Sequence, residues 1–180
     1  MNEPGNLFTF RVGIVGPEST GKSALASALA ARYGCDFVPE MARGYLERLN
    51  RPYVEEDLAR IAHLQTAAED QVLAANPAIL IADTTLLVVK IWSYYKYGRC
   101  DAGIVSAESQ RAYHLFLLCD IDLPWEEDPL REHPNERRQL FSIYYRELIR
   151  KKENFALVFG KEGERLNRAV RAIEHFRKSI

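Results

Sequence analysis

One stretch constrains this chain more than any other part of its sequence, because it reads G-P-E-S-T-G-K-S from residue 16 to residue 23. It fits the phosphate-loop pattern G-x-x-x-x-G-K-[ST]. An apolar run at 8–15 comes directly before it, and an alanine-rich stretch of good helix formers, ending at Gly34, follows it. Strand, glycine loop and helix in this order are the context in which the pattern binds phosphate. The plain alternative is a glycine turn with a surface lysine. We predict a binding site for a nucleoside triphosphate.

The residue types of this loop predict its chemistry. Glycines let the backbone approach a β-phosphate closely, and the helix that follows presents its positive end to that phosphate. Lys22 is expected to bridge the β- and γ-phosphates of ATP and to take part in catalysis, while the Ser23 hydroxyl is expected to ligate Mg²⁺. The nucleotide-binding residues expected from the pattern are Gly16, Pro17, Glu18, Ser19, Thr20, Gly21, Lys22, Ser23 and Ala24.

Length and composition predict one globular domain over residues 1–180. Hydrophobic residues make up 47% of the chain and charged residues 27%, as in a folded protein rather than a disordered or fibrous one. The net charge of -1 gives no global electrostatic reason to expect nucleic acid or an anionic membrane as a partner. No apolar run reaches the roughly 20 residues that span a bilayer. No signal peptide is indicated, and the three cysteines show no paired spacing. We expect a cytoplasmic enzyme that binds small molecules, and we leave its oligomeric state open.

Short apolar runs alternate with helical stretches along the rest of the chain. Five such runs are predicted to form buried strands of a parallel sheet, at 8–15, 37–38, 78–82, 113–119 and 155–159. Between residues 53 and 75, apolar side chains recur at three- and four-residue spacing, which predicts a helix with one buried face. This alternation implies a doubly wound α/β fold. The segment 122–154 departs from it, being rich in Arg, Glu and Pro before a helical run at 140–152, and is a candidate lid.

Acidic residues follow two of the predicted strands, at the sheet edge where open α/β folds bind ligands. Asp83 ends an apolar run and could hold a water of the Mg²⁺ shell, contact the substrate, or cap the helix that begins near Thr84. Glu40 follows D-F-V-P, with Arg43 one helical turn later, and could accept the proton of an attacking hydroxyl. Its alternative is a surface carboxylate favoured by a helix dipole. We predict that Glu40 and Asp83 are catalytic, and that both contact the substrate together with Arg43.

Basic and aromatic residues gather at the start of the candidate lid. Arg131, Arg137 and Arg138 could stabilise the charge of a migrating phosphoryl group, or they could belong to a solvated helix face of Arg–Glu pairs. Of these, Arg131 and Arg138 are predicted as catalytic residues. Trp125 follows the fourth strand and could stack on a flat ring of the substrate or pack in the core.

Four segments taken in order resemble one family, the ribosylnicotinamide kinase domain of NadR-type proteins. They are G-P-E-S-T-G-K-S, V-P-E-M-A-R-G-Y, I-A-D-T-T-L and D-L-P-W-E-E-D-P-L-R, and the likeness runs from residue 10 to residue 176. The resemblance implies a P-loop NTPase fold, a three-layer sandwich with a five-stranded parallel sheet and a helical, arginine-rich lid. It also implies transfer of the γ-phosphoryl group of ATP to the 5′-hydroxyl of nicotinamide riboside, which gives the mononucleotide in NAD biosynthesis.

The resemblance also assigns roles to residues of this chain. It places Lys22 and Ser23 at ATP and magnesium, and 160–165 beside the adenine. The positions that match the acceptor side and the lid of the family are Glu40, Arg43, Asp83, Trp125 and Arg131. Two features depart from the family. Thr85 stands where the family often has a second acidic residue, and the H-x-G-H signature of an adenylyltransferase domain is absent. A stand-alone kinase module is therefore expected.

Two other functions stay open at this stage. One is a kinase for another nucleoside or small metabolite, because the sequence defines the donor site better than the acceptor pocket. The other is a regulatory switch that hydrolyses ATP or GTP without an acceptor. The guanine-reading motif Asn-Lys-x-Asp, which would support a GTPase, is absent.

Overall fold

The computed structural model describes residues 8–161 and 163–179. At its centre lies a sheet of five parallel strands in the order β2-β3-β1-β4-β5. The strands are β1 (Phe10–Val15), β2 (Phe37–Val38), β3 (Ile79–Asp83), β4 (Leu115–Cys119) and β5 (Phe155–Val158). The predicted five-stranded parallel sheet is confirmed. Strand β1 lies between β3 and β4, at the centre of the sheet. The loop that follows β1 therefore begins at the central carboxyl edge of the sheet, where this class of fold binds ligands.

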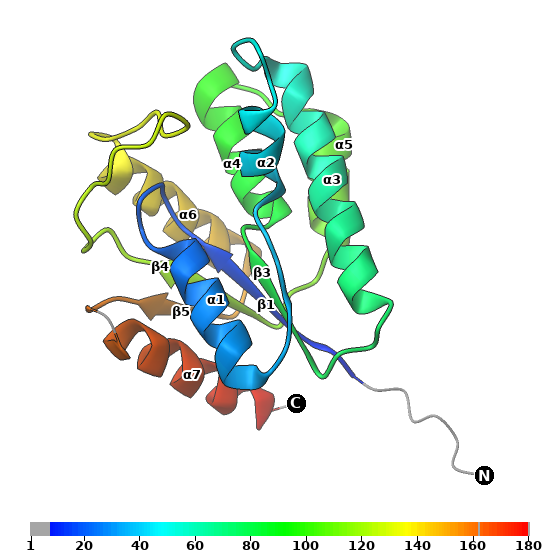
Figure 1. Ribbon diagram of the computed structural model, residues 1–180, viewed down its shortest axis with the longest axis vertical. Helices are drawn as coiled ribbons and strands as arrows, with labels where there is room; N and C mark the ends of the chain where they lie inside the picture. The colour runs from blue at the N-terminus through cyan, green and yellow to red at the C-terminus, as the bar shows by residue number, and fades with distance from the viewer. Residues whose placement is uncertain (1–7, 162, 180) are drawn as a thin grey trace.

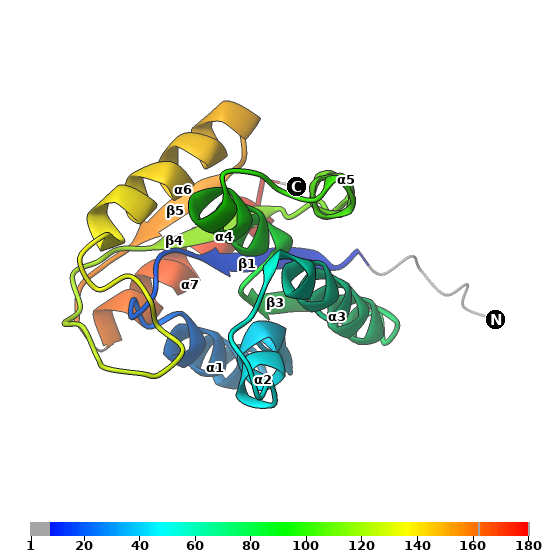
Figure 2. The same ribbon diagram turned by 90° about the horizontal axis from the view of Figure 1, so that it is seen from above.

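Seven helices cover the two faces of the sheet within the described residues (Figure 1). They are α1 (Lys22–Tyr33), α2 (Met41–Glu47), α3 (Glu55–Leu73), α4 (Leu86–Tyr97), α5 (Ala102–Gln110), α6 (Arg137–Lys151) and α7 (Gly163–Arg177). Seen from above, the sheet lies between α1 and α7 on one side and α4 and α6 on the other (Figure 2). This arrangement confirms the predicted three-layer sandwich.

The core is divided by the alternation of side chains along the central strands. In β1, Val12 and Ile14 are fully buried and pack with apolar residues of α1 and α7. Val15 points to the opposite face, where it packs with Leu87 of α4 and Leu148 of α6. Both faces of the central strands are covered, which is why these strands appear in the sequence as continuous apolar runs.

Gly13 lets α4 approach the middle of the sheet. A Cβ atom at this position would lie 2.7 Å from Cγ2 of Thr85 and 3.1 Å from the ring of Phe116. Thr85 immediately precedes α4, so a larger residue at position 13 would push the start of α4 away from the sheet. The glycine therefore allows Thr85 to pack closely on the middle of β1.

The structure revises the start of the helix predicted at 140–152, the extent of the candidate lid, and the alternative that Asp83 caps a helix. Helix α6 begins at Arg137, three residues before the predicted run, and its Leu140, Tyr144 and Leu148 belong to the core. Of the candidate lid at 122–154, the part before α6 and the short connection at 152–154 lack regular structure. We call the connection between β4 and α6 the 120–136 loop. The capping alternative for Asp83 is wrong, because Asp83 is the last residue of β3 and Thr85 occupies the N-cap position of α4.

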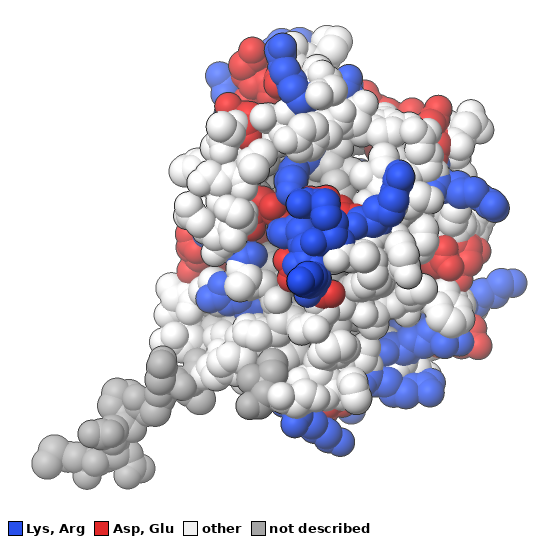
Figure 3. Space-filling view, turned by 180° about the vertical axis from the view of Figure 1, so that it is seen from behind, with Lys and Arg blue, Asp and Glu red and all other residues white. Residues whose placement is uncertain are grey.

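Buried ion pairs join the three helices behind the sheet. Lys90 of α4 is 8% exposed and binds Glu108 of α5 at 3.1 Å and Glu147 of α6 at 2.8 Å. Figure 3 views the molecule from this side and shows basic side chains gathered near the middle with acidic ones beside them. Within the described residues, the helices are too short or too polar to cross a membrane.

Candidate functional site

A cavity of about 380 Å³ opens at the carboxyl end of the sheet. Residues 16–24 form one wall, and the start of α2, one face of α4, the 120–136 loop and α6 form the others. Its lining includes all nine residues predicted to bind nucleotide, together with Glu40, Arg43 and Arg131. The structure therefore brings together most of the predicted site around one space.

The phosphate loop has a backbone shape that its glycines allow. Gly16 has a φ of 138°, and a Cβ atom there would lie 2.8 Å from the carbonyl oxygen of Cys119. Gly21, at the N-cap of α1, has a φ of 73°. Ser19 has a φ of 54°, which is uncommon for a residue with a side chain and is frequent at functional sites. The loop curls around the positive end of α1, as an anion site requires.

The Lys22 side chain folds back onto the first residues of this loop. Its Nζ donates hydrogen bonds to the carbonyl oxygens of Gly16, at 3.0 Å, and Pro17, at 2.8 Å. The Thr20 hydroxyl donates to the same Pro17 oxygen at 2.7 Å. The ammonium group is therefore held where phosphate oxygens would meet the loop.

Of the two predicted carboxylates, Glu40 lines the cavity, whereas Asp83 does not line it and lies next to Ser23 and Lys22, which do. Asp83 is 2% exposed, and burial raises its pKa, while the Ser23 hydroxyl and Lys22 act to lower it. Glu40 is half-buried, and burial also raises its pKa, while Lys22 lowers it and Asp83 raises it further. Both carboxylates thus respond to the same lysine. A carboxylate with a raised pKa is a better proton acceptor than an ordinary one.

The residues present fit the magnesium ion that the fold implies. The Oδ1 atom of Asp83 is buried and has no hydrogen-bond partner among the described residues, although an unpaired buried carboxylate is costly. The Ser23 hydroxyl lies close enough to Asp83 to influence its pKa. No group of three or more His, Cys, Asp or Glu residues that could hold a metal occurs in the described part of the chain. This donor set suits Mg²⁺, which binds one or two protein groups together with phosphates and waters.

The 120–136 loop is held against the phosphate loop. The Glu18 carboxylate accepts hydrogen bonds from the backbone N–H groups of Glu132, at 3.1 Å, and His133, at 3.0 Å. The Ser19 hydroxyl accepts another from a backbone N–H of the same loop at 2.9 Å. The sequence pattern assigned Glu18 and Ser19 to the nucleotide only, and it gave no sign of this second contact.

The three arginines of the candidate lid have different positions. Arg131 lines the cavity and donates to the Ser19 hydroxyl at 3.3 Å. Arg137 lies behind the loop and donates to the carbonyl oxygens of Ser19, at 3.0 Å, and Leu123, at 2.9 Å. Arg138, predicted as catalytic, is exposed and does not line the cavity. Of the two predicted catalytic arginines, the structure places only Arg131 at the site.

Arg43 joins α2 to the 120–136 loop. It lines the cavity and forms an ion pair with Asp128 at 3.0 Å. The hydrogen bond from the backbone N–H of Leu130, and after it this ion pair, hold the pKa of Asp128 below its usual value. The contact brings the E-x-A-R segment and the loop together at one side of the cavity.

The aromatic wall of the cavity differs from the prediction. Trp125 does not line the cavity, and its ring lies about 6 Å from the guanidinium groups of Arg131 and Arg137. Trp92 and Tyr95 of α4 line the cavity instead. Sequence reasoning missed them because two aromatics three residues apart on an apolar helix indicate core packing just as well.

The Trp92 side chain is tied to the 120–136 loop through Tyr53. The indole N–H donates to the Tyr53 hydroxyl at 2.8 Å, and this hydroxyl donates to Glu132 at 2.5 Å. Lys96 also binds Glu132, at 2.9 Å. The aromatic wall and the loop that covers the phosphate site are therefore linked by hydrogen bonds.

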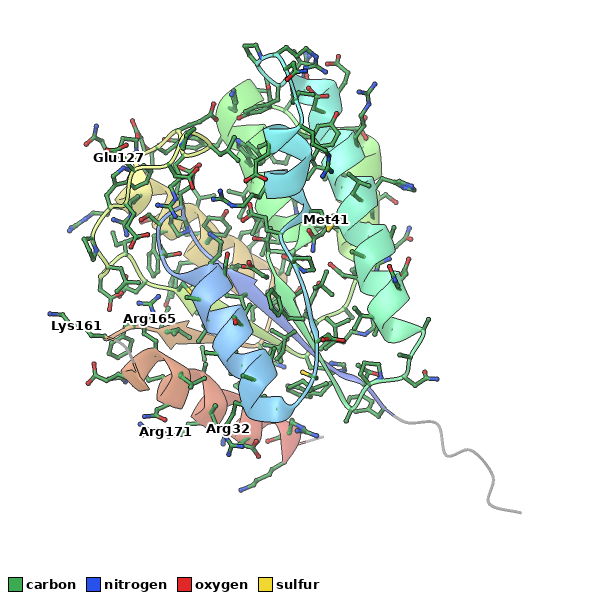
Figure 4. The ribbon with its side chains drawn as sticks, viewed as in Figure 1. Arg32, Met41, Glu127, Lys161, Arg165 and Arg171 are labelled. Carbon is green, nitrogen blue, oxygen red and sulfur yellow. The ribbon has the colours of Figure 1, made fainter. Side chains whose placement is uncertain are left out.

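The predicted adenine-side segment, 160–165, lies next to the phosphate loop. Arg165, labelled in Figure 4, extends from the first turn of α7 and donates to the Thr20 carbonyl oxygen at 2.7 Å. It also pairs with Asp122 at 2.5 Å. Glu162, within this segment, lies outside the described residues.

Comparisons with known proteins agree with this geometry. The family model described as "AAA domain" matches residues 11–165. The chain is 26% identical over 175 residues to the trifunctional NAD biosynthesis/regulator protein NadR of Salmonella typhimurium, covering 93% of this chain and 42% of that protein.

Two solved structures of NadR proteins also match. One, in complex with NR, has a TM-score of 0.78 and 20% identity over 94% of this chain and 52% of its own. The other, in complex with NAD and AMP-PNP, has a TM-score of 0.75 and 20% identity, with 94% and 50% covered. The chain thus spans about half the length of these relatives. The resemblance to NadR-type kinase domains is confirmed, and the chain belongs to the AAA domain family with a P-loop NTPase fold.

Proposed function

We propose that the protein is an ATP- and Mg²⁺-dependent kinase that transfers the γ-phosphoryl group to the 5′-hydroxyl of nicotinamide riboside, giving nicotinamide mononucleotide. One observation carries the proposal. A single cavity is lined by the phosphate loop, by Glu40 and by the aromatic side chains of Trp92 and Tyr95. Such a cavity suits a nucleoside whose ring stacks on the aromatic side chains and whose hydroxyl reaches the γ-phosphate.

The comparisons support this choice of donor and acceptor. The names of the NadR structures give NAD and AMP-PNP, an ATP analogue, in one case and NR, which we take as nicotinamide riboside, in the other. The curated relative is named for NAD biosynthesis. These ligands belong to those proteins, and their assignment to this chain is part of the proposal.

The proposed reaction depends on positioning and charge. The backbone of the phosphate loop and Lys22 hold the β- and γ-phosphates, and Ser23 and Asp83 are the residues that would hold Mg²⁺. Bound there, the ion neutralises charge on the phosphates. Glu40 or Asp83 accepts the hydrogen bond of the acceptor hydroxyl and takes its proton as the oxygen attacks. Arg131 stabilises the charge that develops on the transferred phosphoryl group. The 120–136 loop shields these groups from water.

Acceptor dependence of ADP release tests the proposal. Coupled ADP release is measured with ATP and Mg²⁺ alone, and then with nicotinamide riboside, adenosine, thymidine or deoxyadenosine added. The proposed kinase releases ADP rapidly with nicotinamide riboside, and mass spectrometry of the product finds the 5′-monophosphate. A preference for another nucleoside would move the acceptor assignment to that nucleoside. Release at one rate with and without every acceptor would reject a kinase in favour of an ATPase switch.

A further inference from the structure

Gln65 is a polar side chain in the interior of the protein, outside the cavity. It lies on α3 and is 1% exposed. Its helix neighbours Leu58, Ile61 and Ala62 are apolar and pack in the core. A buried amide in such a setting is costly unless its hydrogen bonds are satisfied, so its partners explain its presence.

The two partners of Gln65 belong to the segments that carry the candidate carboxylates. Its Oε1 atom accepts a hydrogen bond from the backbone N–H of Met41 at 3.1 Å. Its Nε2 atom donates to the carbonyl oxygen of Thr84 at 3.4 Å. Met41 immediately follows Glu40, and Thr84 immediately follows Asp83. One side chain thus bridges the residues that directly follow the two carboxylates.

The contact with Met41 supports the start of α2, directly beside Glu40. The first N–H groups of a helix have no partner within the helix. Met41, labelled in Figure 4, is the first residue of α2, and its N–H uses Gln65 as its acceptor. Glu40, the N-cap residue, makes no capping hydrogen bond with its side chain, and it lines the cavity.

The contact with Thr84 stabilises a residue whose backbone conformation is unfavourable. Thr84 has a φ of 77°, a conformation that a β-branched residue rarely adopts and that persists only when its surroundings hold it. Its N–H donates to the Ile14 carbonyl oxygen at 3.2 Å, and its own carbonyl oxygen receives the Gln65 amide. These two bonds fix the chain on both sides of this residue, directly after Asp83.

We propose that Gln65 is a positioning residue that sets the placement of Glu40 relative to Asp83 for phosphoryl transfer. Gln65 touches neither the reacting atoms nor the phosphate loop, and it acts through the backbone at Met41 and Thr84. The inference rests on the proposed kinase function, and it adds a residue outside the cavity to the machinery of that site.

The test compares Gln65→Met with a matched control on the same helix. Methionine has a similar length but cannot form either hydrogen bond. Thr66→Val is the control, because it removes the neighbouring hydroxyl, which bonds only within α3, to Ala62. Displacing a catalytic group by about 1 Å can cost roughly a hundredfold in rate, so kcat of Gln65→Met should fall by about ten- to a hundredfold. The KM for ATP should change by less than about threefold, because the phosphate loop is not touched. Thr66→Val should match the wild type.

Hydrogen exchange provides a readout that does not depend on activity. In Gln65→Met the amide of Met41 should exchange faster, while amides of α1 and β4 keep their wild-type protection. Gln65→Glu serves as a second variant, because it keeps an acceptor for Met41 and, when its carboxylate is ionised, has no donor for Thr84. It should keep the protection of the Met41 amide and still lower kcat.

Several results would overturn the inference. They are an unchanged Met41 exchange rate in Gln65→Met, a kcat equal to that of the wild type, a loss of kcat shared by Thr66→Val, and a loss of protection spread over the whole chain. If the wild type itself shows no acceptor-dependent turnover, the proposed function fails, and the role of Gln65 in transfer fails with it. The Met41 exchange rate then separates that failure from an error in the contact itself.

Discussion

At the scale of single residues, Lys22 has the most defined expectation. Its Nζ already contacts two carbonyl oxygens of the phosphate loop. Lys22→Ala should lower the rate of phosphoryl transfer by about 10²–10³-fold, because it removes a positive charge from the transferring phosphates. Its thermal midpoint should stay close to that of the wild type, since the side chain is only half-buried. Initial rates and thermal denaturation check both expectations, and retained turnover with a panel of nucleosides would contradict the first.

Substitution of Glu40 should lower activity and, at neutral pH, favour stability. Because burial raises its pKa, the folded protein favours the protonated form more than the unfolded chain does. That contribution to stability is complete below the pKa of the unfolded chain and is lost as the pH rises through the folded-state pKa. Glu40→Gln carries no charge at any pH. Its thermal midpoint relative to the wild type should therefore rise between acidic and neutral pH, while kcat falls by about 10²–10⁴-fold.

Denaturation curves from pH 4 to pH 8 measure this difference. A midpoint difference that does not depend on pH would show that the Glu40 carboxyl has no shifted pKa in the folded protein. An unchanged kcat would remove Glu40 as a candidate base and leave Asp83.

Arg131 and Arg138, the two arginines of the candidate lid that were predicted as catalytic, provide a variant and its control. Arg131 lines the cavity, whereas Arg138 is exposed on α6. Arg131→Ala should lower kcat by about 10²–10³-fold, since it removes a donor from the developing charge. Arg138→Ala should change kcat by less than about twofold, as expected for an exposed side chain away from the site. Steady-state kinetics decides, and equal losses in both variants would contradict the assignment.

The sequence could predict the phosphate loop and not the aromatic wall of the cavity, for a physical reason. The phosphate-loop pattern requires glycines, a lysine and a hydroxyl at fixed spacing, so the pattern itself identifies residues 16–24. Glu40 and Asp83 could be found because ligands bind at strand ends. Trp92 and Gln65 lie within helices whose sequences are consistent with ordinary core packing, and only the fold shows what they face. Arg138 was predicted as one of the arginines of the candidate lid, but on α6 its side chain is exposed and does not line the cavity.

At the scale of elements, α4 and the 120–136 loop each offer a tryptophan for the acceptor. Stacking of a base on an aromatic ring contributes about 1–3 kcal/mol, which is roughly 5- to 150-fold in affinity. We expect Trp92→Ala to raise the acceptor KM by an amount in this range and to leave the ATP KM nearly unchanged. Trp125→Ala should have the smaller effect on acceptor KM, because its ring lies outside the cavity. The reverse order would return the stacking role to Trp125.

Most elements could be predicted from the pattern of the chain, and the exceptions share a cause. The strands of the sheet are short apolar runs because helices cover both faces. Helix α6 begins earlier than its apolar pattern suggests, since its first residues, Arg137 and Arg138, are polar. The 120–136 loop has no period at all, and its position depends on Glu18 and Ser19, which are remote in sequence.

At the scale of the whole molecule, ligand binding should raise the thermal stability. A ligand at 100 times its dissociation constant stabilises a protein by about 2.7 kcal/mol, and for a chain of this size each kcal/mol moves the midpoint by about 2–4 °C. We expect AMP-PNP with Mg²⁺ to raise the midpoint by about 5–10 °C, and nicotinamide riboside to add a further rise. The loss of the AMP-PNP effect in Lys22→Ala serves as the control. A rise with nucleoside alone and none with AMP-PNP would contradict a donor site at the phosphate loop.

Helix α7 extends beyond the part of the chain that the family model matches. The match ends at Arg165, yet Ala169 and Ile173 further along the helix are fully buried and pack against β1 and α1. Arg165 itself bonds to the phosphate loop. A gene fragment trimmed at the family border would leave an apolar groove on the sheet open to water and would cut the support of this arginine. For cloning, domain fusion or tagging, the shortest reliable unit therefore extends at least through Arg177.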